Sequence, residues 1–182
     1  MLVNDYYSYK EYSDPIDEIF LRIKNFISDN SYIMISSSMG ALILYECCCR
    51  IKCKNMPLPE RVFLISLTSP LYIEKIKQNE ERCISSIYNN QNSRLLKVIK
   101  KLVLRVFSLV KNITFHSIKL ETKAFVFYAS EDIMTFDIKS WNKYFSEPIY
   151  QKMKGDHFIF ITSASLIVEE IKNNISSDYI II

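Results

Sequence analysis

Apolar residues follow two different spacings along this chain. From Pro15 to Ser28 they recur at the three- and four-residue intervals of a helix with one buried face. Elsewhere they form short uninterrupted runs between polar or turn residues, which indicates buried strands. This pattern predicts strands at 31–36, 61–66, 123–129 and 149–153, and helices at 15–28, 39–51, 136–145 and 163–173.

Alternation of buried strands with helices predicts an α/β fold with a mostly parallel sheet and helices on both of its faces. We expect residues 1–182 to form a single domain, because no repeat or low-complexity linker divides the chain. The stretch 71–120 interrupts the alternation and is predicted to be mainly helical. We interpret this stretch as a helical lid inserted into the α/β domain.

Composition and charge restrict the functional classes. Apolar residues make up 49% and charged residues 24% of the chain, which is the balance of a globular protein. The net charge of +3 is too small to indicate a nucleic-acid partner, and no nucleic-acid-binding motif accompanies it. Neither a signal peptide nor an apolar run of about 18 residues occurs, so we expect a cytoplasmic protein without stable membrane insertion.

The five cysteines do not form a pattern that indicates disulfides or zinc. Four of them cluster at 47–53 on a predicted helix, with no histidine nearby. Metal-binding cysteines follow defined spacings that this cluster does not match. We therefore expect small core residues here, and we expect neither a metal nor a cofactor.

A serine stands where a buried strand meets a helix, in the segment 35–42. A nucleophile elbow has the pattern Gly-x-Ser-x-Gly, with small residues two before and two after the serine because strand and helix pass close together. Gly40 meets the second requirement and Ser36 replaces the first glycine. Ser38 is then the nucleophile candidate, and the Met39 amide would face the oxyanion. The alternative is an ordinary serine that caps the helix.

The acid and base candidates follow in the order Ser, Asp/Glu, His that α/β-hydrolases use. Strand 123–129 is followed by two carboxylates, of which Asp132 fits the spacing better and Glu131 is the fallback. Both could instead cap the next helix. His157 comes later, on a loop opened by a glycine, whereas His116 precedes the acid and lies in the predicted helical block. The pattern predicts a Ser38–Asp132–His157 triad for acyl transfer to water.

Several segments together resemble the type II, stand-alone thioesterases of non-ribosomal peptide and polyketide synthesis. Residues 38–46 resemble their Ser-Met-Gly-Ala segment, residues 127–132 their acid loop, and Trp141 with residues 155–158 their Trp and Gly-Asp-His-Phe region. The resemblance runs from about residue 10 to 175. It implies an α/β-hydrolase fold. The family's first strands and its Pro-Gly-Ala-Gly-like loop, which supplies a second oxyanion amide, have no counterpart before residue 15, so we expect an N-terminally truncated version.

The resemblance also implies a substrate and a partner. Such enzymes hydrolyse acyl or aminoacyl thioesters on the phosphopantetheine arm of acyl and peptidyl carrier proteins, and 71–120 would be their lid. The basic amphipathic stretch 94–111 would be a lid helix, and its lysines could also face an acidic carrier protein or a membrane surface. Two alternatives remain open at this point: a general carboxylesterase, or an impaired remnant that acts as an interaction module.

Overall fold

A five-stranded sheet forms the centre of the fold, in the order β4-β3-β2-β1-β5. The computed structural model describes residues 15–27, 31–72, 75, 104–105, 108, 113–175 and 180–182. Every strand pairing among them is parallel. The strands are β1 (Tyr32–Ser37), β2 (Arg61–Ile65), β3 (Lys123–Ala129), β4 (Ile149–Met153) and β5 (Ile180–Ile181). Their carboxyl ends therefore lie along one edge of the sheet.

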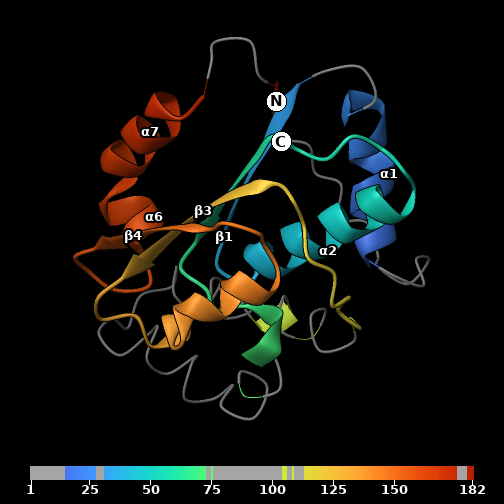
Figure 1. The fold of residues 1–182 in the computed structure, drawn as a ribbon. Helices are drawn as coiled ribbons and strands as arrows, with labels where there is room; N and C mark the ends of the chain where they lie inside the picture. The colour runs from blue at the N-terminus through green and yellow to red at the C-terminus, as the bar shows by residue number, and fades with distance from the viewer. Residues whose placement is uncertain are drawn as a thin grey trace.

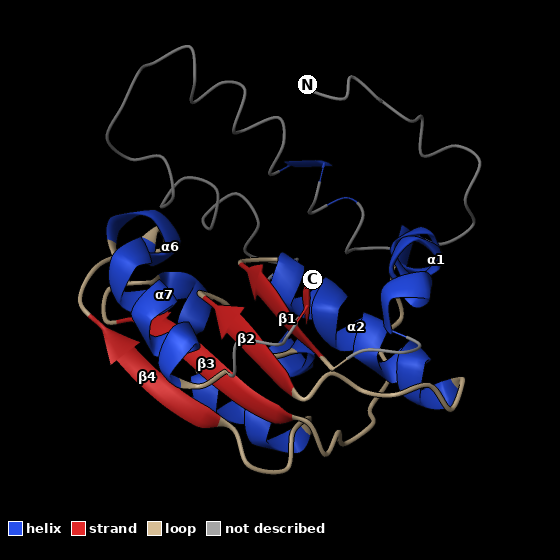
Figure 2. Cartoon of the chain, turned by 90° about the horizontal axis from the view of Figure 1, so that it is seen from above, coloured by secondary structure: helices blue, strands red, loops and turns tan. Residues whose placement is uncertain are grey.

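Helices cover both faces of this sheet (Figures 1 and 2). One face packs against α1 (Pro15–Ile27) and α2 (Gly40–Cys53), and the other against α6 (Ile159–Thr162) and α7 (Ala164–Asn173). Successive strand residues point to opposite faces, so Ile33 belongs to the core beside α7 and Met34 to the core beside α2. Both faces of each central strand are buried, which explains why these strands are continuous apolar runs.

The helices and strands predicted from apolar spacing are largely present. Each of the four predicted strands exists within one residue of its expected bounds, and the expected helices 15–28, 39–51 and 163–173 correspond to α1, α2 and α7. The fold is thus of the α/β-hydrolase-like class expected, with a parallel sheet between helical layers. Most of 71–120, including the basic stretch 94–111 and the proposed lid, lies outside the described residues.

The local structure differs from the prediction in several places. The expected helix 136–145 is a 3₁₀ helix, η3 (Ile138–Lys143), rather than an α-helix, and a separate 3₁₀ segment, η2 (Ile133–Thr135), precedes it. A further 3₁₀ turn, η1 (Pro70–Tyr72), follows β2, and the short β5 was not anticipated at all. Residues 113–119 are not helical, although they belong to the block predicted as mainly helical.

The departure at 113–120 has a visible cause in α2. The Tyr45 hydroxyl shares its one proton between the carbonyl oxygens of His116 and Ile118, at 2.8 and 2.9 Å, and accepts from the Ile118 amide at 3.1 Å. Glu46 accepts from the amide of His116 at 3.0 Å. Side chains of α2 thereby satisfy the backbone groups that a helix would have paired internally. Tertiary contacts override the local helical preference at this segment.

Candidate active site

A tight turn between β1 and α2 carries Ser38 at the carboxyl edge of the sheet. Its backbone has a φ of 53°, a left-handed conformation that is uncommon for a residue with a side chain. The Ser38 amide donates to the carbonyl of Ile65 on β2 at 2.7 Å, and the Ser38 carbonyl accepts from Ala41 at 2.9 Å. Strand, turn and helix thus hold the serine in a strained position, as in a nucleophile elbow.

The residues on either side of this turn pass close to each other. A Cβ placed on Gly40 would lie 3.4 Å from the Cβ of Ser36. The space between strand and helix admits two small residues, so the serine at 36 takes the place usually held by glycine without disrupting the turn. This contact explains why both positions must remain small.

Ser38, His157 and Asp132, from three separate loops, meet at this edge. The Ser38 Oγ lies 2.8 Å from His157 Nε2, and His157 Nδ1 lies 2.9 Å from Asp132 Oδ2. His157 and Asp132 are buried, with 7% and 8% of their surfaces exposed. A carboxylate only accepts hydrogen bonds, so Nδ1 donates to Asp132 and Nε2 is free to accept the serine proton. Both distances fall within the range that general-base catalysis needs.

Asp132 rather than Glu131 reaches the imidazole. The second oxygen of Asp132, Oδ1, accepts the amide of Met134 at 2.8 Å, so the carboxylate caps η2 while it contacts His157. The side chain of Glu131 is exposed, and its amide donates to the Gly155 carbonyl at 3.0 Å. This backbone contact fastens the loop of the acid to the loop of the histidine.

The loop that carries His157 depends on the second glycine of the chain. Gly155 has a φ of 128°, which residues with a side chain rarely adopt. Asp156 Oδ1 then accepts the amide of Phe158 at 2.9 Å and closes the loop just before α6. The ring of Phe158 packs edge-on against the imidazole, with centroids 5.8 Å apart. The turn at Gly155 and the aromatic contact together direct His157 toward Ser38.

The Met39 amide lies directly after Ser38, at the start of α2. Met39 has helical φ and ψ, and the amides of Leu42 and Ile43 bond back to its carbonyl at 3.2 and 3.4 Å. Its own amide has no acceptor among the described residues. The first turn of α2 contains no acidic residue, so the partial positive charge of the helix start is not neutralised there. This amide has the position expected for a donor to an oxyanion on the serine adduct.

The remaining sequence candidates lie elsewhere. His116 contacts Glu46, with 2.7 Å between Nδ1 and Oε1, on the α2 face. Cys47, Cys48 and Cys49 are buried core residues, as predicted, whereas Cys53 is exposed. Burial raises the pKa of Cys49 to about 12 and that of Cys48 well above its usual range, so both thiols stay protonated. Within the described residues, no three His, Cys, Asp or Glu side chains are grouped so as to hold a metal ion.

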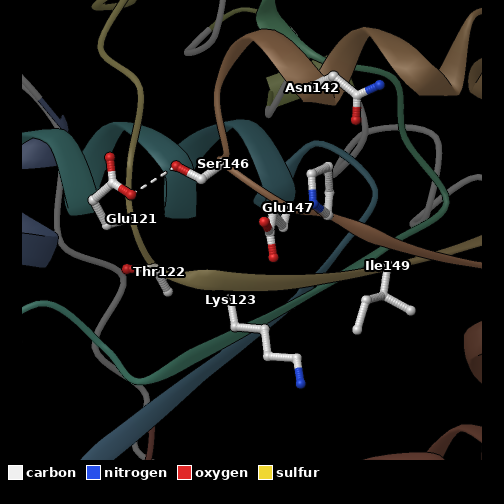
Figure 3. A pocket seen from close by; sticks show the side chains of 8 residues that line it. Glu121, Thr122, Lys123, Asn142, Ser146, Glu147 and Ile149 are labelled. Carbon is white, nitrogen blue, oxygen red and sulfur yellow. Dashed lines mark hydrogen bonds between the residues drawn. The ribbon is translucent and has the colours of Figure 1, made fainter.

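A large pocket lies away from this edge. It has a volume of about 690 Å³ and opens at the amino ends of β3 and β4 (Figure 3). Charged and polar side chains, among them Glu121, Lys123 and Glu147, surround it, and Ser146 donates to Glu121 there at 2.8 Å. Because parallel strands share one direction, this pocket is at the opposite end of the sheet from Ser38. It forms no part of the candidate active site.

The sequence did not reveal the backbone contacts that hold the acid. The Met134 amide that bonds to Asp132 belongs to η2, and the carbonyl of Met134 accepts the amide of Thr68 at 3.0 Å. Backbone groups carry no residue signature, so no motif could have shown them. The sequence offered only two acidic residues before an expected helix, a pattern that indicates helix capping rather than a contact with η2 or Thr68.

Comparison with known proteins gives structural matches without sequence matches. No family model matches the chain, and no curated protein matches it in sequence. Human thioesterase 2 is similar in structure, with a TM-score of 0.65 and 23% identity over 89% of this chain and 83% of that one. ClbQ from the colibactin NRPS/PKS pathway matches with a TM-score of 0.68 and 13% identity, over 87% of this chain and 74% of that one. YbtT, a type II thioesterase from the yersiniabactin pathway, matches with a TM-score of 0.64 and 18% identity, over 87% of this chain and 71% of that one.

These likenesses show the fold. The chain has an α/β-hydrolase-like fold, which it shares with solved structures that include human thioesterase 2 and the type II thioesterase YbtT. Identities are low throughout, and a shared fold does not by itself determine the activity. None of the helices within the described ranges has the length and apolar character needed to cross a membrane.

Proposed function

We propose that this chain is a serine thioesterase that hydrolyses acyl or aminoacyl thioesters on the phosphopantetheine arm of carrier proteins. The observation that carries the proposal is the contact of one imidazole with both Ser38 Oγ and Asp132 Oδ2, at 2.8 and 2.9 Å. The three side chains follow the chain order used by α/β-hydrolases, and their contacts suit a nucleophile, a base and an orienting acid.

In the first half of the reaction, His157 Nε2 takes the proton of Ser38 as Oγ attacks the thioester carbonyl. The Asp132 carboxylate stabilises the imidazolium that forms. The tetrahedral oxyanion accepts a hydrogen bond from the Met39 amide, which is the donor that we assign. Collapse breaks the C–S bond, and the imidazolium returns its proton to the leaving thiolate. The products are the free phosphopantetheine thiol and an ester on Ser38.

In the second half, water attacks the ester while His157 Nε2 takes one of its protons. The new tetrahedral intermediate uses the same amide of Met39. Its collapse breaks the bond to Ser38 Oγ, which recovers a proton from the imidazolium. The carboxylic acid leaves, and the serine is ready for another turnover.

Two findings favour a thioester on a carrier protein as the substrate. Solved structures with this fold include YbtT, a type II thioesterase from the yersiniabactin NRPS/PKS pathway, and ClbQ from the colibactin NRPS/PKS pathway. The motifs around Ser38, Asp132 and His157 also resemble those of the type II enzymes. A carrier protein would be the partner, with its arm reaching the edge where the three side chains meet.

The test is hydrolysis of a short-chain acyl group on a phosphopantetheinylated carrier protein by the full chain. We expect Ser38→Ala to lower kcat by about 10⁶-fold and Asp132→Asn by about 10⁴-fold, because nucleophile and orienting acid are lost in turn. Glu131→Gln is the matched control for the acid and should leave kcat unchanged, since that side chain is exposed and does not reach His157.

Two results would contradict this proposal. If Ser38→Ala hydrolyses the acyl thioester at the same rate as the unaltered chain, the serine mechanism is refuted. A higher kcat/KM for free oxygen esters than for the carrier thioester would leave the mechanism but assign the chain to the general carboxylesterases.

A further inference from the structure

The short segment after β2, Leu67–Ser69, lies between η3 and the loop of the acid. In Figure 1 the orange turns of η3 lie beside the green turn of η1, which follows this segment. All three of its residues are buried, with 1% or less of their surfaces exposed. None of them contacts Ser38 or His157 through any hydrogen bond in the described structure. The hydrogen bonds of the segment therefore reach the site through neighbouring residues.

On one side the segment is fixed by η3. The indole Nε1 of Trp141 donates to the Leu67 carbonyl at 3.0 Å, and Ser69 Oγ donates to Ser140 Oγ at 2.7 Å. Trp141 is fully buried and Ser140 is 6% exposed. Buried hydrogen bonds of this kind keep their geometry because no water competes for the donor or acceptor.

On the other side the segment holds the acid. The Thr68 amide donates to the Met134 carbonyl at 3.0 Å, and the Met134 amide donates to Asp132 Oδ1 at 2.8 Å. η2 has only three residues, of which Ile133 is 46% exposed whereas Met134 and Thr135 are buried. A turn this short has few internal bonds, so the contact from Thr68, together with the burial of Met134, sets its position.

We propose that Trp141 is a positioning residue for the acid Asp132. Its indole N–H holds the Leu67 carbonyl, and the amide of the next residue, Thr68, holds the Met134 carbonyl of η2. The Met134 amide in turn holds the Asp132 carboxylate that orients His157. This inference rests on the proposed serine mechanism, because it concerns how accurately the acid meets the imidazole. Displacements of about 1 Å far from the reacting atoms can lower a rate by about 10²-fold.

A purely structural role for Trp141 makes a different prediction. Its ring packs against those of Tyr45, Tyr144 and Phe145, with centroids 6.2, 6.0 and 5.8 Å away, so it also fills the core. Trp141→Phe keeps an aromatic ring in that cluster and deletes the N–H. Tyr45→Phe is the matched control: it also deletes a buried donor to backbone carbonyls, but at the 116–118 segment rather than at Leu67.

The experiment compares kcat, KM and thermal unfolding of the two variants on an acylated carrier protein, with proton NMR of the His157 Nδ1–H. We expect Trp141→Phe to lower kcat by about tenfold or more at unchanged KM, and to weaken or broaden the downfield Nδ1 resonance. Tyr45→Phe should lose comparable stability yet keep both kcat and the resonance. Equal kcat in the two variants would overturn the positioning role.

A second pair of substitutions covers the case in which Trp141→Phe does not fold. Ser69→Ala combined with Ser140→Ala removes the side-chain links of Ser140 to Ser69 and Thr68 and changes the volume little, so the Trp141 bond alone then joins η3 to the segment. We expect a loss of kcat at unchanged KM, because the segment is less firmly held; an unaltered kcat would show that loosening the segment does not reach Asp132 and would overturn the inference. Failure of Ser38→Ala to abolish hydrolysis would instead refute the proposed function, so the two failures are distinguishable.

Discussion

A single residue, Asp132, has two roles that the sequence presented as alternatives. One carboxylate oxygen caps η2 through the Met134 amide, and the other contacts His157. Acidic residues before helices are common, so capping alone could have explained an aspartate at position 132. The chain order of serine, acid and histidine identified the residues that meet, because a triad needs that order in this fold. The choice of Asp132 over Glu131 depended on spacing, and the exposed Glu131 agrees with it.

Gly155 provides a test at this same scale. We expect Gly155→Ala to lower the free energy of unfolding by about 1–3 kcal/mol, because a side chain is strained at a φ of 128°. kcat should fall as well, since His157 is two residues further along the loop. Urea unfolding followed by tyrosine and tryptophan fluorescence, together with hydrolysis of an acylated carrier protein, measures both effects.

The other glycine of the chain is the control for this substitution. A Cβ at Gly40 would meet Ser36 at an ordinary contact distance of 3.4 Å, and its backbone has no positive φ. Gly40→Ala should therefore leave the free energy of unfolding nearly unchanged. If the two substitutions cost the same stability, backbone strain at Gly155 is not the cause.

At the scale of elements, the spacing of apolar residues predicted the strands and helices whose burial is visible in their own sequence. β2 and β3 are apolar on both faces because helices cover both, and a run such as 123–129 leaves few other interpretations. The helical prediction for 113–119 was wrong because contacts distant in sequence decide its structure: Tyr45 and Glu46, about 70 residues earlier, bind its backbone groups. β5 has two residues and depends on its pairing with β1, so no local pattern could predict it.

The anchoring of 113–119 can be tested at Glu46. This carboxylate is fully buried, accepts the amide and Nδ1 of His116, and has Arg50 Nε at 3.5 Å. We expect Glu46→Ala to lower the free energy of unfolding by about 1–3 kcal/mol, because the His116 amide and Nδ1 lose their hydrogen bonds to a fully buried carboxylate. Limited proteolysis should then cut first within 113–119.

An exposed glutamate on another helix serves for comparison. Glu169→Ala on α7 should change the free energy of unfolding by less than about 0.5 kcal/mol and leave the proteolysis pattern as it is. Unchanged protection of 113–119 in Glu46→Ala would show that the apolar side chains of that segment, rather than this carboxylate, hold it in place.

The strand that leads into Ser38 lies near one edge of the sheet. Among the described residues, β1 is followed outward only by β5, whose two residues pair with Tyr32 and Ile33. The Ile182 amide donates to Ile33 at 3.0 Å, and its carbonyl accepts from Ile35 at 2.9 Å. Residues from the far end of the chain thus cover the strand that leads into Ser38 (Figure 2). The strand that leads into Ser38 therefore takes part in a long-range pairing that no local segment of the sequence can form.

Removal of residues 180–182 tests this pairing. We expect the deletion to lower the free energy of unfolding by about 1–3 kcal/mol, because the ladder bonds to β1 are lost. The bared edge of β1 should also promote self-association, which light scattering detects. Ile181→Lys is the matched variant: its side chain is 60% exposed, so the substitution keeps the backbone pairing and should cost little. If the deletion keeps the stability and the monodispersity of Ile181→Lys, β5 does not protect β1.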